Sequence, residues 1–249
     1  LDKGRGVIEE IEPRTSLLVR LAPTPRGVYR QILIANPDQA IFAFACAHPQ
    51  PRLGMLDRFL VIAEKQGIPA VILANKVDLV GVEKARDIFE HYRPLGYPVI
   101  YSSARLGQGV DELKDVLAGR ISVFAGPSGV GKSTLLNTIQ PGLGLVVREI
   151  SRATRKGRHT TVFRELFPLK DGGYVADTPG LKALALWDIE PEEIDAYFPE
   201  LRSLVEDCQF SDCTHVHEPG CAVLLAVAEG RVSPARYESY LRMRFGKDE

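Results

Sequence analysis

Short apolar runs separated by turn residues fill the first part of the chain. Four runs have the length and composition of strands, and they cover residues 5–12, 16–22, 28–35 and 40–47. Prolines lie between the runs, and no stretch there has the 3.6-residue repeat of an amphipathic helix. The pattern therefore predicts an all-β unit, a small antiparallel barrel or sheet, which we assign to residues 1–48.

From residue 55 the pattern changes, and strands alternate with helices. Apolar runs of strand length cover residues 69–75, 98–104 and 121–126. Helical stretches cover residues 55–67, 81–93 and 109–119, and another helix is expected from Lys132. This alternation is typical of βαβ units, and it predicts a central α/β domain with a parallel sheet over residues 49–186. The pattern of the remaining residues, 187–249, predicts a mostly helical third domain.

Composition and charge narrow the possible partners. The chain has 249 residues, a net charge of −1 and 45% apolar residues, which is ordinary for a globular protein. No apolar run approaches the roughly 18 residues of a membrane span, so we expect a cytoplasmic protein that does not contact membranes. Residues 148–158 carry five basic side chains against one acidic, whereas residues 187–212 carry nine acidic against one basic. The first stretch suits contact with phosphate and the second does not.

The stretch GPSGVGKST fits the phosphate-binding pattern G-x-x-x-x-G-K-[ST], with an apolar strand before it and a helix after it. Glycines let backbone N–H groups converge on phosphate oxygens, and the helix N-terminus adds partial positive charge. Lys132 is expected to reach the β- and γ-phosphates, and Ser133 to coordinate Mg²⁺. The predicted phosphate-binding residues are Gly126, Pro127, Ser128, Gly129, Val130, Gly131, Lys132, Ser133 and Thr134.

The stretch NKVDL at residues 75–79 predicts that the base is guanine. A carboxylate such as that of Asp78 can accept hydrogen bonds from both N1–H and the 2-amino group of guanine, whereas adenine presents an acceptor at N1. Asn75 is expected to hold the loop and contact the base, and the Lys76 stem to cover the face of the base. Ser103 and Ala104 resemble the last guanine-contacting motif of GTPases, in which a backbone N–H donates to the base carbonyl.

Two later stretches resemble the switch regions of GTPases. In DTPG, at residues 177–180, Asp177 would hold the Mg²⁺ shell through a water and the Gly180 N–H would contact the γ-phosphate. In KGRHTT, Thr161 is expected to complete the Mg²⁺ coordination, with Thr160 as the alternative.

The residue after DTPG is Leu181, where many GTPases have a glutamine that orients water. An aliphatic side chain cannot orient or activate water. His159, beside the switch threonine, is therefore the predicted catalytic residue, and an RNA contact is the alternative role for it. Leu181 also leaves open a scaffold that binds GTP only as a structural ligand.

The order of these motifs is unusual. GTPases ordinarily begin with the phosphate loop and end with the two guanine-reading motifs, whereas here NKVDL and SSA precede the phosphate loop, HTT and DTPG. Moving the first two behind the rest restores the usual series. We therefore predict a circular permutation, in which the helix over residues 109–119 leads directly into the strand of the phosphate loop.

A cluster of cysteines and a histidine lies in the C-terminal part. Cys208, Cys213 and Cys221 fall within fourteen residues, with His215 and His217 between them. Three thiolates and one imidazole complete a tetrahedral Zn²⁺ shell, which leaves no open position and so indicates a structural metal. Spacing alone leaves the choice between the two histidines open.

Taken together, these motifs resemble the circularly permuted GTPases of bacterial small-subunit ribosome biogenesis, the RsgA (YjeQ) family. The resemblance covers nearly the whole chain and includes the stretches DRFLVIAEKQGIPAVILANKVDL, GRHTT, DTPG and CQFSDCTHVHEPGCAV. Set against that family, we expect the first strand of the barrel to be absent or shortened in this sequence.

The resemblance implies an N-terminal OB-fold, a central GTPase and a C-terminal zinc domain in which His215 is the ligand. It implies that His159 is catalytic, and that a monomeric protein binds GTP, GDP, the 30S subunit and 16S rRNA, with turnover stimulated by the particle. A permuted GTPase acting on another ribosomal particle is the rival interpretation.

Overall fold

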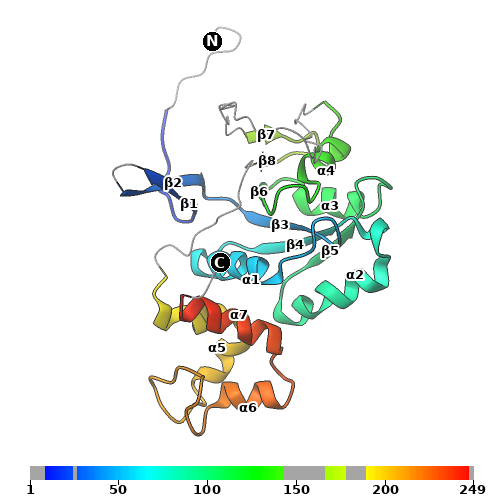
Figure 1. Ribbon diagram of the computed structural model, residues 1–249. Coiled ribbons are helices and arrows are strands. Elements are labelled where there is room, and N and C mark those ends of the chain that lie inside the picture. Colours follow the sequence, from blue (N-terminus) through cyan, green and yellow to red (C-terminus); the bar gives the residue numbers. More distant parts are fainter. Residues whose placement is uncertain (1–8, 25–26, 143–165, 178–188, 247–249) are drawn as a thin grey trace.

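The computed structural model describes residues 9–24, 27–142, 166–177 and 189–246. Within them the chain forms a small antiparallel sheet, a larger mixed sheet with helices on both faces, and a helical C-terminal region (Figure 1). The three regions follow one another along the sequence, as the hydrophobic pattern predicts.

The N-terminal sheet consists of β1 (Leu17–Thr24) and β2 (Gly27–Ala35), which pair antiparallel. At its open end the Asn36 side chain accepts a hydrogen bond from the Thr15 N–H at 2.8 Å and donates one to the Pro13 carbonyl at 2.8 Å. Leu18 is fully buried, so the sheet shares the main hydrophobic core. The described residues thus contain a small β-sheet at the position of the expected barrel.

The third predicted strand of that barrel lies elsewhere. Strand β3 (Gln39–Ala45) pairs in parallel with β4 (Ala70–Asn75) on one side and with β6 (Ile121–Ala125) on the other. The assignment of residues 40–47 to the N-terminal domain is therefore wrong. Every residue of β3 is buried, and an unbroken apolar run is typical of a parallel strand covered on both faces rather than of a barrel strand.

The larger sheet has the strand order β5-β4-β3-β6-β8-β7. The further strands are β5 (Val99–Ser102), β7 (Leu166–Pro168) and β8 (Tyr174–Asp177). All neighbouring strands pair in parallel except β7, which pairs antiparallel with β8 at the edge. The carboxyl ends of five strands therefore meet along one edge of the sheet.

Helices cover both faces of this sheet. Helix α1 (Leu53–Gln66) and helix α2 (Val82–Phe89), which continues as the 3-10 turn η2 (Glu90–Leu95), share one core with Phe42 and Phe44. Helix α3 (Val110–Leu117) and helix α4 (Lys132–Ile139) share the other core with Ile41 and Ala43. Successive side chains of β3 thus enter opposite cores, as the two-residue period of a strand requires.

The C-terminal region packs on the α1 side of the sheet (Figure 1). Its elements are η3 (Pro191–Tyr197), α5 (Pro199–Val205), α6 (Ala222–Ala228) and α7 (Pro234–Arg244). They surround a third core that contains Phe198, Leu201 and Tyr240. Val61 of α1 belongs to this core as well, so the C-terminal region is packed against the α/β sheet rather than separate from it.

The connection expected for a circular permutation is present. Helix α3 ends at Leu117, and after three residues the chain enters β6, the strand that precedes the phosphate loop. Among the described helices, none has the length and apolar character needed to cross a membrane. The boundary expected at residues 186–187 lies outside the described residues.

Candidate nucleotide site and metal centre

The predicted nucleotide motifs follow neighbouring strands at the same edge of the sheet. NKVD begins at the end of β4, SSA at the end of β5 and the phosphate loop at the end of β6. Strand β8 ends at Asp177, whose backbone is paired with Phe124, two residues before the phosphate loop. Ligands of open α/β sheets bind outside the carboxyl ends of the strands, and this edge is therefore the candidate nucleotide site.

Two glycines of the phosphate loop have no room for a side chain. Gly126 has φ 147°, and a Cβ placed there would lie 2.0 Å from the Ala43 carbonyl oxygen of β3. Gly131 has φ 99°, and a Cβ there would lie 2.5 Å from Nδ2 of Asn75. Both positions combine a left-handed backbone with close contact, so glycine is required at each.

The lysine of the loop points back into it. Lys132 begins α4, and its Nζ donates to the carbonyl oxygens of Gly126 at 2.7 Å and Pro127 at 2.9 Å. Ser133 follows on the first turn of α4 and is half-buried. The N-terminal N–H groups of this helix and the Lys132 ammonium thus face the loop that would hold phosphates.

Asn75 links all three loops. Its side chain is buried, and Nδ2 donates to the Val130 carbonyl of the phosphate loop at 2.7 Å. Its Oδ1 accepts from the Ser102 hydroxyl at 3.2 Å and from the Ala104 N–H at 3.4 Å. The amide therefore fixes the SSA motif and the phosphate loop relative to the end of β4.

Lys76 extends over the same edge with a left-handed backbone, φ 65°. Its Nζ donates to the Gly129 carbonyl at 2.6 Å and to the His48 carbonyl. Partial burial lowers the pKa of this ammonium, and the Asp78 carboxylate opposes that shift. The contact with His48 has no sequence signal of its own, because it depends on β3 lying beside β4.

Asp78 is exposed to solvent at the end of the motif, where a base could reach it. Its Oδ1 accepts a hydrogen bond from the Ser103 hydroxyl at 2.6 Å, and the same hydroxyl accepts from the Leu106 N–H at 3.2 Å. Ser103 therefore orients the carboxylate. The sequence predicts a backbone contact to the base at Ser103 and Ala104 but not this side-chain role.

The predicted hydrolytic residues belong to segments that the structure does not describe. His159, Thr160, Thr161, Gly180 and Leu181 all lie outside the described residues. Asp177 is described only by its backbone pairing at the end of β8. The described residues therefore cover the base-reading and phosphate-reading parts of the predicted site.

Four potential metal ligands come together in the C-terminal region. One ligand atom from each of Cys208, Cys213, His215 and Cys221 lies within 4.8 Å of every other. The His215 Nδ1 lies 3.6 Å from the Cys208 sulfur and 3.4 Å from the Cys221 sulfur. Three of the four residues are buried and Cys208 is half-buried. His217 is exposed and outside the cluster, so the geometry favours His215.

These distances fit a zinc ion. With Zn–S near 2.3 Å and Zn–N near 2.05 Å, a tetrahedral shell places sulfur and nitrogen about 3.5 Å apart. The two S···N separations lie on either side of this value. Burial raises the pKa of the Cys213 thiol to about 12, so the binding of a cation there would release a proton. Four protein donors leave no position for a substrate.

Two carboxylates contact the His215 ring and the backbone around the four potential metal ligands. Oδ2 of Asp195 lies 3.2 Å from Nε2 of His215, which leaves Nδ1 facing the three sulfurs. Glu218 accepts from the N–H groups of Thr214, Val216 and His217 at 2.8, 2.9 and 3.0 Å. Hydrogen bonds, first from the Thr214 hydroxyl, hold the pKa of Glu218 well below its usual range. Such outer contacts orient metal ligands in proteins.

Comparisons with known proteins agree with this geometry. Residues 11–187 match the family model described as RsgA GTPase, which covers more than half of the chain. The chain belongs to the RsgA GTPase family. It is therefore a GTPase, a hydrolase of GTP.

Relatives extend the match to the C-terminal region. The Small ribosomal subunit biogenesis GTPase RsgA of Gemmatimonas aurantiaca is 50% identical over 237 residues, 95% of this chain and 77% of that protein. The protein of the same name from Moorella thermoacetica is 49% identical over 238 residues, 96% of this chain and 78% of that protein.

Two solved structures share the fold. YjeQ from Thermotoga maritima superposes with a TM-score of 0.78 at 40% identity, covering 98% of this chain and 80% of that chain. YloQ, a circularly permuted GTPase, superposes with a TM-score of 0.72 at 34% identity, covering 95% of this chain and 73% of that chain. The predicted permutation and the predicted fold class are confirmed.

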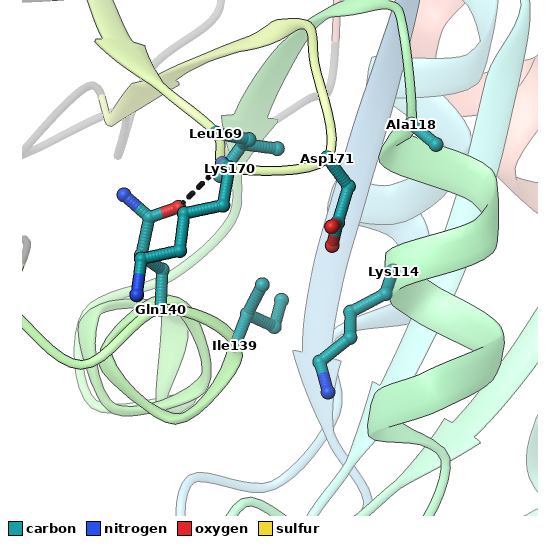
Figure 2. Close-up of a pocket in the computed structure, with 7 residues that line it drawn as sticks. All are labelled: Lys114, Ala118, Ile139, Gln140, Leu169, Lys170 and Asp171. Carbon is teal, nitrogen blue, oxygen red and sulfur yellow. Dashed lines mark hydrogen bonds between the residues drawn. The ribbon is translucent and has the colours of Figure 1, made fainter.

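One pocket of this RsgA-family GTPase lies away from both sites (Figure 2). Its volume is about 120 Å³, and its lining includes Lys114 of α3, Gln140 after α4, and Asp171 of the β7–β8 turn. Figure 2 shows the Lys114 and Asp171 side chains extending into the same opening. These residues lie near the amino ends of β6 and β8, opposite the phosphate loop. The pocket is also small for a nucleotide.

Proposed function

We propose that this GTPase acts in the maturation of the small ribosomal subunit, with turnover stimulated by that particle. The observation that carries the proposal is the gathering of NKVD, SSA and the phosphate loop at one edge of a permuted sheet, in a chain that matches Small ribosomal subunit biogenesis GTPases along 95% of its length. The acidic C-terminal region makes the N-terminal sheet and the basic stretch at 148–158 the better candidates for contact with 16S rRNA.

Guanine recognition is assigned to the ends of β4 and β5. The exposed Asp78 carboxylate, held by Ser103, is oriented to accept both N–H donors of guanine. Asn75 holds the SSA backbone against the phosphate loop, and the Ala104 N–H, which donates to Oδ1 of Asn75 at 3.4 Å, would exchange that long contact for the base carbonyl. Lys76 would cover the face of the base with its stem.

Phosphate binding is assigned to residues 126–134. In the nucleotide-bound form, Lys132 would exchange its carbonyl contacts for phosphate oxygens, which a charge-assisted bond favours. We propose Ser133 and Thr161 as Mg²⁺ ligands, with Asp177 acting through a water and Gly180 contacting the γ-phosphate.

For the chemistry we propose His159 as the residue that positions water. Leu181 cannot do so, and His159 lies beside the switch threonine in sequence. His159→Ala is expected to keep GTP and particle binding and to lose stimulated hydrolysis by about 10²-fold. If His159→Ala hydrolyses GTP at the wild-type rate on the small subunit, His159 is not the residue that positions water. Joint loss of particle binding and hydrolysis would make His159 an RNA contact.

We further propose that the Cys208–Cys213–His215–Cys221 cluster holds one structural Zn²⁺, that the protein works as a cytoplasmic monomer, and that it divides into three domains. The first domain boundary then falls before β3, because that strand belongs to the GTPase sheet.

Phosphate release tests the function. Purified protein with saturating GTP is assayed alone, with small subunits and with large subunits. Stimulation by small subunits only is the expected result. Stimulation by large subunits only would favour a GTPase of another particle, and binding without stimulation would favour a GTP-dependent scaffold.

A further inference from the structure

Helix α7 connects the metal cluster to the GTPase sheet. The Tyr237 hydroxyl of this helix donates to the His215 carbonyl at 2.5 Å, and the Tyr240 hydroxyl donates to the Thr214 carbonyl at 2.9 Å. Two other side chains of the helix, Arg236 and Ser239, both donate to the carboxylate of Asp57 on α1. One helix thus holds the metal loop and a helix of the GTPase domain.

The Arg236 side chain makes the strongest of these links. It is 1% exposed, and its Nη1 donates to Oδ1 of Asp57 at 2.7 Å. Its Nε and Nη2 donate to the two carboxylate oxygens of Glu200 on α5 at 2.7 and 3.2 Å. The guanidinium lies 4.4 Å from the centre of the Phe198 ring. Arg236 therefore joins three helices through its planar fork, which lysine cannot imitate.

The charges of this cluster depend on one another. Asp57 is 2% exposed and also accepts from the Tyr92 hydroxyl at 2.7 Å. Burial opposes the charge of Arg236, but Asp57 and Glu200 keep the pKa of the guanidinium above its ordinary value. Removing one partner of a buried ion pair leaves an uncompensated charge, whereas removing both does not.

The other ion pairs between α1 and the C-terminal region are more exposed. Lys65 pairs with Glu193 at 2.7 Å, with side chains 22% and 34% exposed, and Arg202 pairs with Glu64 at 3.4 Å, with side chains 59% and 25% exposed. Exposed pairs contribute little because water screens them. Arg236 therefore makes the most buried of these ion pairs with α1.

Helix α1 leads directly to the nucleotide site. The segment 46–52 connects it to β3, and within that segment the Cys46 N–H donates to the Asn75 carbonyl at 2.8 Å. The His48 carbonyl accepts from the Lys76 ammonium, which also donates to Gly129 of the phosphate loop. A shift of α1 would therefore move the His48 carbonyl, which accepts a hydrogen bond from Lys76.

We propose that Arg236 is a positioning residue of the GTPase, which holds Asp57 so that α1 and the segment 46–52 place Lys76 against the phosphate loop. The inference rests on the proposed nucleotide site and deepens it, because it brings the C-terminal region into that site's regulation. Coupling is reciprocal, so bound nucleotide in turn secures α7 and the metal loop.

The test compares Arg236→Met with Arg231→Met. Arg231 lies in the same region but pairs only at the surface with Glu229 among the contacts described. The measured quantities are the dissociation constant for fluorescent GDP, well below the unfolding temperature, and amide exchange along α1 in the nucleotide-free protein. Arg236→Met is expected to weaken GDP binding about 5-fold or more and to accelerate exchange in α1. Arg231→Met is expected to change neither.

Asp57→Asn/Glu200→Gln/Arg236→Met removes all three buried charges and keeps the protein testable if the single variant does not fold. It is expected to unfold near the wild-type temperature and still to bind GDP about 5-fold or more weakly. Wild-type GDP affinity in this triple variant, or in a folded single variant, would reduce Arg236 to a stabilising residue and overturn the proposal.

The exchange measurement separates this proposal from the proposed nucleotide site. If the wild-type protein itself bound no guanine nucleotide, the nucleotide site would be wrong, whatever Arg236 does. Unchanged exchange in α1 of Arg236→Met would overturn the positioning role even if nucleotide binding were normal.

Discussion

The residues of the metal centre lie close together in the sequence, whereas those of the nucleotide edge lie far apart. The metal ligands fall within residues 208–221, whereas the nucleotide motifs described here run from Asn75 to Asp177 and follow four different strands. The spacing of neighbouring residues determines the first site. The order of strands in a sheet determines the second, which explains how a permuted sequence can keep the same site.

The two sites also differ in how their polar groups are satisfied. At the nucleotide edge, the groups already bind one another: Lys132 donates to loop carbonyls and Ser103 donates to Asp78. A ligand there exchanges existing hydrogen bonds for new ones, which suits reversible binding. In the metal centre, three thiols and an imidazole converge in a largely buried space. That arrangement suits an ion that is retained.

The largest difference is expected when a metal ligand is removed. Cys213→Ser should weaken zinc binding by about 10²- to 10³-fold, because one of four ligands to a structural zinc is lost. Metal analysis of the purified protein measures the effect. Cys46→Ser makes the same chemical change at a buried thiol outside the cluster and should keep one zinc per chain. Full zinc content in Cys213→Ser would contradict the assignment.

The corresponding change at the nucleotide edge is Lys132→Ala. Loss of charge-assisted contacts to phosphates should weaken GTP binding by about 10- to 10²-fold, at about 1.5–3 kcal/mol for a contact to a charged group. Zinc content should not change. Titration with a fluorescent GTP analogue measures the affinity, and Lys114→Ala, in the remote pocket, serves as the control. Equal GTP affinities in Lys132→Ala and Lys114→Ala would contradict the assignment of Lys132 to phosphate binding.

A smaller change concerns the support of a metal ligand. Asp195→Asn keeps the shape of the contact with His215 but removes its charge, and zinc affinity should fall about 10-fold. Competition with a chromophoric chelator measures this affinity. Asp212→Asn, an exposed acid in the same region, should leave it unchanged. If both variants behave alike, Asp195 does not orient the histidine.

Sequence reasoning reached the local features and missed those that depend on packing. The zinc spacing and the phosphate loop could be read directly, because each is a pattern of close residues. The permuted order follows from the sequence order of such local motifs. The position of β3 could not be assigned from alternation with turns, although its unbroken apolar run is a signal for a strand buried on both faces. Arg236 and Asp57 are 179 residues apart, and neither belongs to a motif.

The same limit applies to the contacts that position Lys76 and Asp78, the residues predicted to contact the base. The carbonyl of His48 contacts Lys76 only because β3 and β4 are neighbours, and Ser103 meets Asp78 only because β4 and β5 are. Viewed in the sequence, the C-terminal region is a separate module. Packed against α1, it becomes part of the support of the nucleotide site.

The central claim is that a permuted sheet gathers a guanine-specific site at one edge, and Asp78→Asn tests it most directly. The amide offers one acceptor and one donor, so it matches the edge of xanthine better than that of guanine. Affinities for GTP and xanthosine triphosphate are measured on the wild type and on the variant. The variant should bind GTP more weakly by about 1–3 kcal/mol and prefer xanthosine triphosphate. Unchanged GTP affinity in Asp78→Asn would contradict the account.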